Sequence, residues 1–400
     1  MTSSRIIGVD VARALALLGM VVAHMGDAFV GAEASVDPWH QVVAGRSSAL
    51  FAVLAGLSIV LATSSVSSSA SSQGLPNLRF DSRPVLARRA VLIAMIGLLL
   101  GAVAEGIAVI LTYYGVLFLC ALPVLRWRAR SLALLAVGWG VAAPVVSLAL
   151  RPFLPEPSLR IPAPSSLADP LALISELLVT GYYPVLTWAT YLFAGMAIGR
   201  LDLRSRVVAL RLALGGCVLA VVSIGISALI TRLMSVQQSL LDTYNREGVR
   251  DWGELSGVLT KGLFGTTPTG SWWWLAVWSP HSGSMVDLAH TVGSALVILG
   301  GALFATSGLP DGGRRVVSVI FGAGSMALTL YVVHVVALAL PRDWDWVQEI
   351  WVHVSVLAGA GALFAARRAQ GPLERLVADA SRAAQGGALP TPHRGPSTGQ

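Results

Sequence analysis

Long apolar stretches separated by short polar segments run through almost the whole sequence. A transmembrane helix needs about 20 mostly apolar residues to cross the hydrocarbon core of a bilayer. Ten stretches meet this need within some tolerance: Ile6 to Phe29, Ser47 to Thr63, Ala90 to Ala104, Val109 to Leu125, Ser131 to Leu150, Tyr183 to Gly199, Val207 to Ile230, Leu288 to Thr306, Val316 to Leu340 and Val352 to Ala366. The pattern predicts an all-α polytopic membrane helix bundle with about ten transmembrane helices.

The composition excludes a water-soluble protein. Of the 400 residues, 55% are hydrophobic and 12% are charged, whereas a soluble chain carries about 25% charged residues. The net charge of +7 does not indicate nucleic-acid binding, because the cations are almost all arginines scattered through short loops rather than gathered on one basic face. The apolar excess therefore predicts contact with the lipid bilayer, and we expect no nucleic-acid partner.

The arginines also predict the orientation of the helices. Positive charge is enriched in cytoplasmic loops, and placing the N-terminus in the cytoplasm puts the arginine-rich segments 79–89, 126–130, 200–206, 314–315 and 367–368 on that side. We therefore expect both termini to be cytoplasmic. The longest outer loop, from Arg232 to Asp287, has room for a short helix, and Leu171 to Thr180 is consistent with a half-helix.

The pattern divides the chain into two parts. Residues 1–366 are expected to form one transmembrane domain. Residues 367–400 are rich in Gly, Pro and Ala, a composition that predicts a disordered cytoplasmic tail. The use of arginine with a single lysine, Lys261, is typical of a GC-rich bacterial genome, so a bacterial plasma membrane is the expected location.

The first apolar stretch carries four ionisable residues, Asp10, Arg13, His24 and Asp27. In a helix Arg13 and His24 return to within about 20° of one face and lie roughly 16 Å apart along the axis. Charged groups inside a membrane are costly and need paired partners or an aqueous cavity. Two interpretations are open: ion pairs near the two interfaces, or a functional stripe facing an internal cavity.

The functional interpretation assigns chemistry to each residue of the stripe. A histidine is suited to general base catalysis near neutral pH, and a carboxylate one turn away, here Asp27, can orient its ring. Arg13, with Asp10 one turn below it, opens toward the cytoplasm and is suited to binding phosphate. No cluster of His and Cys residues has the spacing of a metal site, so we expect no metal.

Several strings in the chain resemble known membrane acyltransferases. Arg-x10-His in the first helix, here Arg13 and His24, is similar to the motif of the acyltransferase-3 superfamily. The longer string from Arg5 to Met20 most resembles the bacterial branch related to the catalytic domain of heparan-alpha-glucosaminide N-acetyltransferase and the neighbouring DUF418-type proteins. Further matches are Ser48-Ala-Leu-Phe-Ala-Val-Leu-Ala-Gly-Leu-Ser58, Tyr114-Gly-Val-Leu117 and Gly324-Ser-Met-Ala-Leu-Thr-Leu-Tyr-Val-Val-His334.

The resemblance implies an activity. In that superfamily an acyl group from cytoplasmic acyl-CoA, here expected to be acetyl-CoA, passes to an acceptor that is often a sugar on the far side of the membrane. It implies that His24 is the base and that Arg13, with Asp10, contacts the donor. The lysosomal members carry a His-Ala-x-Trp-Asn-Gly stretch before the second helix, where this chain has Pro38-Trp39-His40-Gln41.

Further residues are candidates on the acceptor side, where a carbohydrate or another envelope component is expected. They are His40, Arg46 and His281. His281 precedes the eighth stretch, where Ser282 or Ser284 can also cap a helix. His290 and His334 fit either a hydrogen-bonded core or a catalytic role. An alternative function is a proton-coupled transporter or a lipid or sugar flippase that uses the Asp10, Arg13 and His24 stripe as a relay.

Overall fold

The computed structural model describes residues 5–29, 38–72, 82–104, 106–158, 160–244, 248–340 and 346–383. Within these ranges, the side chains of residues 26–29, 38–40, 64–72, 346 and 383 lie outside the description. All regular elements of the described residues are helices. The predicted all-α class is therefore confirmed.

Seven helices of the described residues are long and apolar enough to cross a membrane. They are α1 (Ile7–Phe29), α3 (Arg46–Ser72), α4 (Arg83–Gly101), α6 (Ala129–Leu150), α9 (Arg206–Ile230), α12 (Met285–Ser307) and α15 (Trp346–Ala366). An eighth span is possible if Pro170–Thr180 and Val185–Ile198, which are bent by 51° relative to each other, are taken together. The count of ten and the orientation of the termini stay predictions.

The bent pair contains the half-helix expected before the sixth stretch. Its first part consists of α7 (Pro170–Ser175) and η3 (Glu176–Thr180), a turn of π-helix, and its second part is α8 (Val185–Ile198). Two shorter apolar helices, α5 (Leu111–Cys120) and α14 (Ala327–Leu338), occupy the places of the fourth and ninth predicted spans.

The ninth predicted span, Val316 to Leu340, is interrupted in the structure. It consists of α13 (Asp311–Ile320), η5 (Gly322–Ser325) and α14. The interruption lies where η5 packs against α1, because a Cβ atom on Gly324 would overlap the backbone oxygen of Asp10. Hydropathy alone does not reveal such a close backbone approach, so the apolar pattern of this segment predicts one continuous span.

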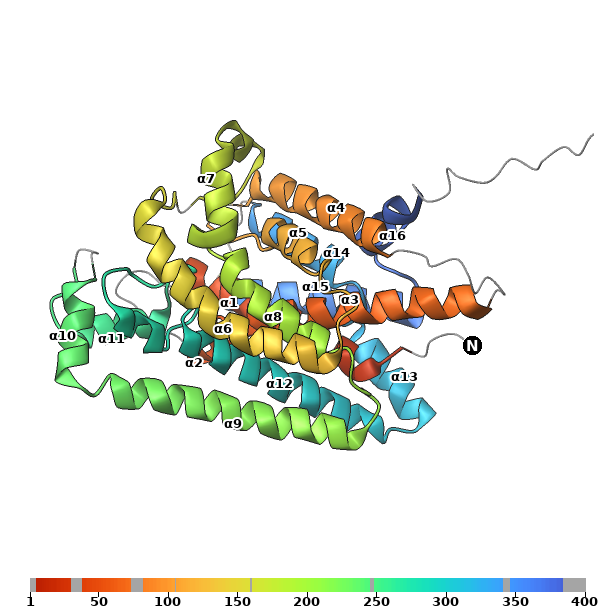
Figure 1. The fold of residues 1–400 in the computed structure, drawn as a ribbon. Coiled ribbons are helices and arrows are strands. Elements are labelled where there is room, and N and C mark those ends of the chain that lie inside the picture. The colour runs from red at the N-terminus through yellow and green to blue at the C-terminus, as the bar shows by residue number, and fades with distance from the viewer. Residues whose placement is uncertain are drawn as a thin grey trace, which may run out of the picture.

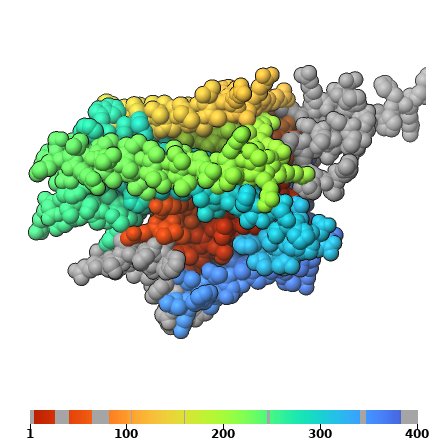
Figure 2. All heavy atoms as spheres, turned by 90° about the horizontal axis from the view of Figure 1, so that it is seen from below, coloured from red at the N-terminus to blue at the C-terminus, as the bar shows by residue number. Residues whose placement is uncertain are grey.

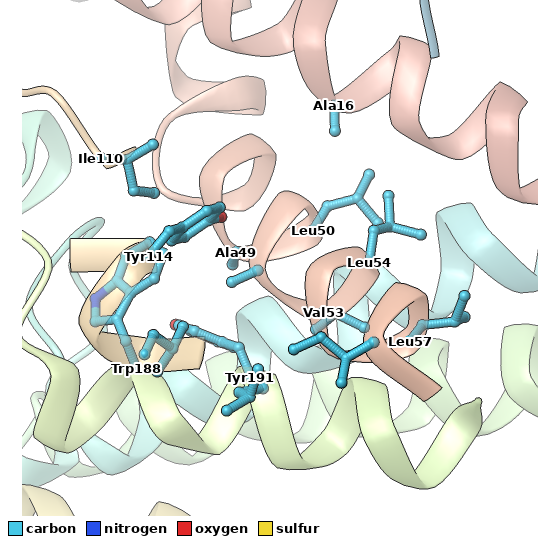
Figure 3. Close-up of a cluster of buried hydrophobic side chains, with 14 of the residues drawn as sticks. Ala16, Ala49, Leu50, Val53, Leu54, Leu57, Ile110, Tyr114, Trp188 and Tyr191 are labelled. Atoms are coloured by element: carbon cyan, nitrogen blue, oxygen red, sulfur yellow. The ribbon is translucent and has the colours of Figure 1, made fainter. Parts of the chain in front are cut away.

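Helix α3 lies at the centre of the core. Figure 3 shows its side chains Leu50, Leu54 and Leu57 between α1 and α8, with Ala16 on one side and Tyr191 on the other. Small residues allow α3 and α8 to approach closely: a Cβ atom on Gly56 would overlap the backbone oxygen of Leu192. Such small-residue contacts are typical of helix packing within membranes.

Helix α9 covers the outside of the bundle. It packs on α12, lies across the face shown in Figure 2, and leaves apolar side chains such as Leu214, Val218 and Leu229 exposed. A soluble protein would not expose a continuous apolar face of this kind. The face is consistent with contact with lipid.

The long loop from Arg232 to Asp287 forms a small folded cap. It contains α10 (Met234–Asp242), α11 (Trp252–Lys261) and η4 (Trp272–Ala276). The loop therefore has more regular structure than the one short helix expected from the sequence. Its own apolar cluster includes Leu240, Leu255 and the fully buried Trp274. Figure 1 shows α10 and α11 at the end of the bundle opposite to α13 and α16.

The C-terminal segment differs from the expectation of a disordered tail in one part. Residues Pro372–Ala383 form α16, which packs against α4 and α14. The carboxylate of Glu374 accepts hydrogen bonds from the backbone N–H groups of Leu328 and Thr329, at 2.8 and 3.2 Å. Glu374 thereby satisfies free amides at the start of α14, which explains why the segment is ordered here. Residues 384–400 lie outside the described residues.

Candidate active site

A cavity of about 680 Å³ opens at the end of the bundle where α1 ends and α3 begins. Its walls come from α1, from the start of α3, from the segment between α4 and α5, and from the turn between η3 and α8. Residues 261–264 of the cap cover it. The volume is in the range of sites for small organic ligands. In the predicted orientation this is the outer end of the bundle.

The wall of the cavity contains ionisable and aromatic side chains. They are His24, Tyr113, Arg160, Glu176, Tyr182, Tyr183, Lys261, Phe264 and His281. Glu176 is buried, and its Oε1 atom accepts a hydrogen bond from the backbone of Ser158 at 2.9 Å. Arg160 and Lys261 are exposed. The rim therefore carries two cations, and the interior is polar enough to hold a ligand with hydrogen-bonding groups.

His24 lies in this wall and contacts a second histidine. Its Nδ1 atom is 3.2 Å from Nε2 of His334 on α14, and the two rings are nearly parallel, with centroids 5.4 Å apart. The side chain of Asp27, the partner expected from the sequence, lies outside the described residues. His334 is thus the observed neighbour of Nδ1, and the orienting role of Asp27 stays a prediction.

A third histidine continues the row. The Nδ1 atom of His334 is 2.8 Å from Nδ1 of His353 on α15, and the two rings are perpendicular. Both side chains are buried, with 1% and 6% of their surface exposed. His353 is not among the candidate residues predicted from the sequence, although an ionisable residue within a predicted span is in itself a sign of function.

Asp10 and Arg13 lie elsewhere on α1. The Nη1 atom of Arg13 donates to Oδ1 of Asp10 at 3.1 Å, and its Nη2 atom donates to the hydroxyl of Ser58 on α3 at 2.5 Å. Arg5 forms a second ion pair with Asp10. Neither Asp10 nor Arg13 is in the cavity wall. Asp10 and Arg13 therefore form the ion pair of the first interpretation, and neither shares this cavity with His24.

The acceptor-side candidates have different environments. His281 lines the cavity and has a positive φ of 57°; its Nε2 atom accepts a hydrogen bond from the backbone N–H of Gly45 at 3.1 Å. The side chain of Arg46 does not line the cavity and instead donates to Nε2 of His290 at 2.9 Å and to the backbone oxygen of Gln41. The side chain of His40 lies outside the described residues.

The interpretation of residues 280–284 as a helix start is also correct. The hydroxyl of Ser284 accepts a hydrogen bond from the backbone of Asp287 at 3.0 Å and caps α12. The cap and the cavity position of His281 therefore coexist. In the part of the chain that the structure describes, no group of three or more His, Cys, Asp or Glu residues is arranged to hold a metal ion.

The strings that carry the family resemblance contribute to the contacts around these residues. Ser58 binds Arg13, and the hydroxyl of Tyr114 donates to the backbone oxygen of Ser48 at 3.3 Å. The string from Gly324 to His334 touches α1 at its first residue and His24 at its last. The strings are far apart in the sequence, but these contacts link three of them to one another or to α1.

The fold and this cavity define a multi-pass membrane protein with an ionisable interior site. A model of the family described as "Heparan-alpha-glucosaminide N-acetyltransferase, catalytic" matches residues 5–235, which is more than half of the chain. The protein belongs to this family, which indicates a membrane acetyltransferase-like function. A search of the curated proteins found no match.

Proposed function

We propose that the protein transfers an acetyl group from acetyl-CoA, which enters from the cytoplasm, to an amino or hydroxyl group of a carbohydrate or another acceptor of the bacterial cell envelope. The observation that carries this proposal is the position of His24 in the wall of the cavity, with its Nδ1 atom held by His334. An imidazole fixed at one nitrogen can present the other to a substrate. The family match supports the type of reaction.

In this proposal His24 is the general base. Its Nε2 atom takes the proton from the acceptor N–H or O–H group while the acceptor nitrogen or oxygen attacks the thioester carbonyl. The C–S bond then breaks, and the thiolate of coenzyme A leaves with the bonding electron pair. General base catalysis of this kind typically contributes a factor of about 10²–10⁴ in rate. Asp27, one turn after His24, is a second group that can stabilise the imidazolium.

The donor is proposed to bind toward the N-terminal end of α1. Arg13 lies there and donates hydrogen bonds to Asp10 and Ser58. A guanidinium group can also bind a phosphate group of the donor through charge-assisted hydrogen bonds. Asp10 neutralises only part of the charge, because it is shared by Arg5 and Arg13, and it is proposed to hold Arg13 in place.

The acceptor is proposed to enter the cavity beneath the cap. His281, Tyr182 and Tyr183 line its wall, and aromatic rings of this kind can stack on the apolar face of a sugar ring. Arg46 is proposed to act as a positioning residue, because it links the backbone of α2 (Pro38–Val43) to α12 through Gln41 and His290. His40 stays a candidate on the same side.

The test is a transfer assay with the purified full-length protein in lipid vesicles. Radiolabelled acetyl-CoA is supplied with either glucosamine or an envelope extract, and transfer is compared between the wild type and His24→Gln. The control is Tyr191→Phe, which removes a buried hydrogen bond to Thr291 away from the cavity. We expect the control to transfer label and His24→Gln to lose at least about 100-fold in rate. Equal transfer by both variants would show that His24 is not the base. Movement of substrate across the vesicle membrane without acetyl transfer would favour the alternative function, a transporter or flippase.

A further inference from the structure

We propose that His24, His334 and His353 form a proton relay that carries the acceptor proton away from the cavity, through the helix interface, toward Glu349. The inference rests on the proposed role of His24 as a base and adds two further residues to the reaction. Both lie outside residues 5–235, which match the family. They come from α14 and α15, so the relay would join three helices that are distant in the sequence.

The geometry of His334 carries the proposal. Its Nε2 atom faces Nδ1 of His24 at 3.2 Å, and its Nδ1 atom faces Nδ1 of His353 at 2.8 Å. These distances are in the range of N–H···N hydrogen bonds. One ring therefore joins two others through different nitrogens. Three imidazoles arranged in a row, rather than around a common point, are suited to passing protons and not to enclosing a metal ion.

Each step of the relay balances in protons. In the resting row, Nδ1 of His24 donates to Nε2 of His334, and Nδ1 of His334 donates to Nδ1 of His353. This direction leaves a lone pair on Nε2 of His24. When that atom takes the acceptor proton, His24 passes its Nδ1 proton to His334, which passes its own Nδ1 proton to His353. His24 is then neutral again, and the positive charge lies on His353.

The surroundings of His353 favour charge at that end of the row. Glu349 lies one turn earlier on α15, on the same face, and both side chains are buried. A buried carboxylate stabilises a nearby imidazolium because the local dielectric is low. Tyr331 is a further titratable ring beside His24, with ring centroids 6.2 Å apart, and its hydroxyl oxygen accepts a hydrogen bond from the backbone of Ile110. The positive charge would therefore have a lower free energy on His353 than on His24, which favours proton transfer along the row.

The first test requires no enzymatic activity. The wild-type protein, labelled with ¹⁵N-histidine and reconstituted in lipid, is studied by solid-state NMR. We expect scalar couplings across both N–H···N hydrogen bonds and a proton on Nδ1, not Nε2, of His24. In His353→Gln the titration of His24 should shift, while in Tyr191→Phe it should match the wild type. Absence of couplings, together with a His24 titration unaffected by His353→Gln, would overturn the relay.

The second test measures kinetics with acetyl-CoA and glucosamine as probe substrates. Glutamine can keep a hydrogen bond but cannot accept a proton as imidazole does. His334→Gln and His353→Gln should therefore each lower kcat by roughly 10–100-fold with little change in KM. The wild type should show a curved dependence of kcat on the deuterium fraction of the solvent, because several protons move, and the variants a linear one. If the wild type is active, and if the folded variants have the same kcat and the same isotope effect as the wild type, the relay is rejected. The acyltransferase proposal would not be affected by that result. A wild type that shows both couplings but transfers no acetyl group to glucosamine or to the envelope extract would reject the acyltransferase proposal alone.

Discussion

Gly324 packs against Asp10 so closely that a Cβ atom on the glycine would overlap the backbone oxygen of Asp10. This contact fixes η5 against α1 one element before α14. Because α14 carries His334, the spacing between η5 and α1 also decides whether His334 can reach His24. A single close backbone contact therefore links the start of the first helix to the row of histidines.

Gly324→Ala should destabilise the protein. The added methyl group forces η5 away from α1, and overpacking of this kind costs about 1–3 kcal/mol. Thermal unfolding in detergent measures the change, and we expect a lower Tm. Gly138→Ala on α6 is the matched control, because its Cβ atom would meet nothing within 4 Å. Replacing a helical glycine with alanine there should leave Tm unchanged or raise it; equal Tm values for both variants would contradict the packing argument.

Glu374→Ala should also lower Tm, although Glu374 lies in the segment predicted to be a disordered tail. Its carboxylate accepts hydrogen bonds from the backbone of Leu328 and Thr329 and from the Thr329 hydroxyl, the last at 2.5 Å. Leaving such donors unsatisfied costs about 1–3 kcal/mol. The comparison variant is Asp379→Ala on the same helix, where the exposed pair with Arg382 is worth about 0–1 kcal/mol. Glu374→Ala with the same Tm as Asp379→Ala would mean that α16 does not stabilise α14.

The class of fold could be predicted from the sequence because it depends on local composition. Apolar runs indicate helices wherever they occur, and the spacing of three residues between Asp10 and Arg13 indicates a contact on one turn of a helix. The half-helix before α8 could be predicted for the same reason. Each of these features is determined by residues close together in the chain.

The histidine row could not be predicted in this way. His24 and His334 are separated by 310 positions, and no local pattern shows that α1, α14 and α15 meet at these residues. The break between α13 and α14 likewise depends on a tertiary contact, between Gly324 and α1. The order of α16 depends on amides that are left free at the start of α14. In each case the deciding partner is supplied by a distant part of the chain.

Arg13→Gln should be more destabilising than the double variant Asp10→Asn/Arg13→Gln. The single change leaves the Asp10 carboxylate, only 5% exposed, with Arg5 as its remaining ion-pair partner among the described residues, whereas the double change removes the buried charge as well. Arg5 is half exposed and can be solvated without Asp10. A double-mutant cycle on unfolding should yield a coupling energy of about 1–3 kcal/mol. The exposed Arg375–Asp379 pair is the reference, for which we expect less than about 1 kcal/mol; similar coupling in both cycles would argue against a buried ion pair.

Lys261 offers a direct test of the predicted orientation, because it is the single lysine of the chain. It is exposed at the end of α11 and borders the cavity. If the arginine distribution predicts the topology correctly, Lys261 lies outside the cell, and the amine at the N-terminus lies in the cytoplasm. A membrane-impermeant amine reagent applied to intact cells should then label the wild type and not Lys261→Arg. After the cells are opened, the N-terminal amine should become reactive in both. Labelling of Lys261 that requires opened cells would invert the orientation, and the cavity would then face the cytoplasm, on the same side as acetyl-CoA.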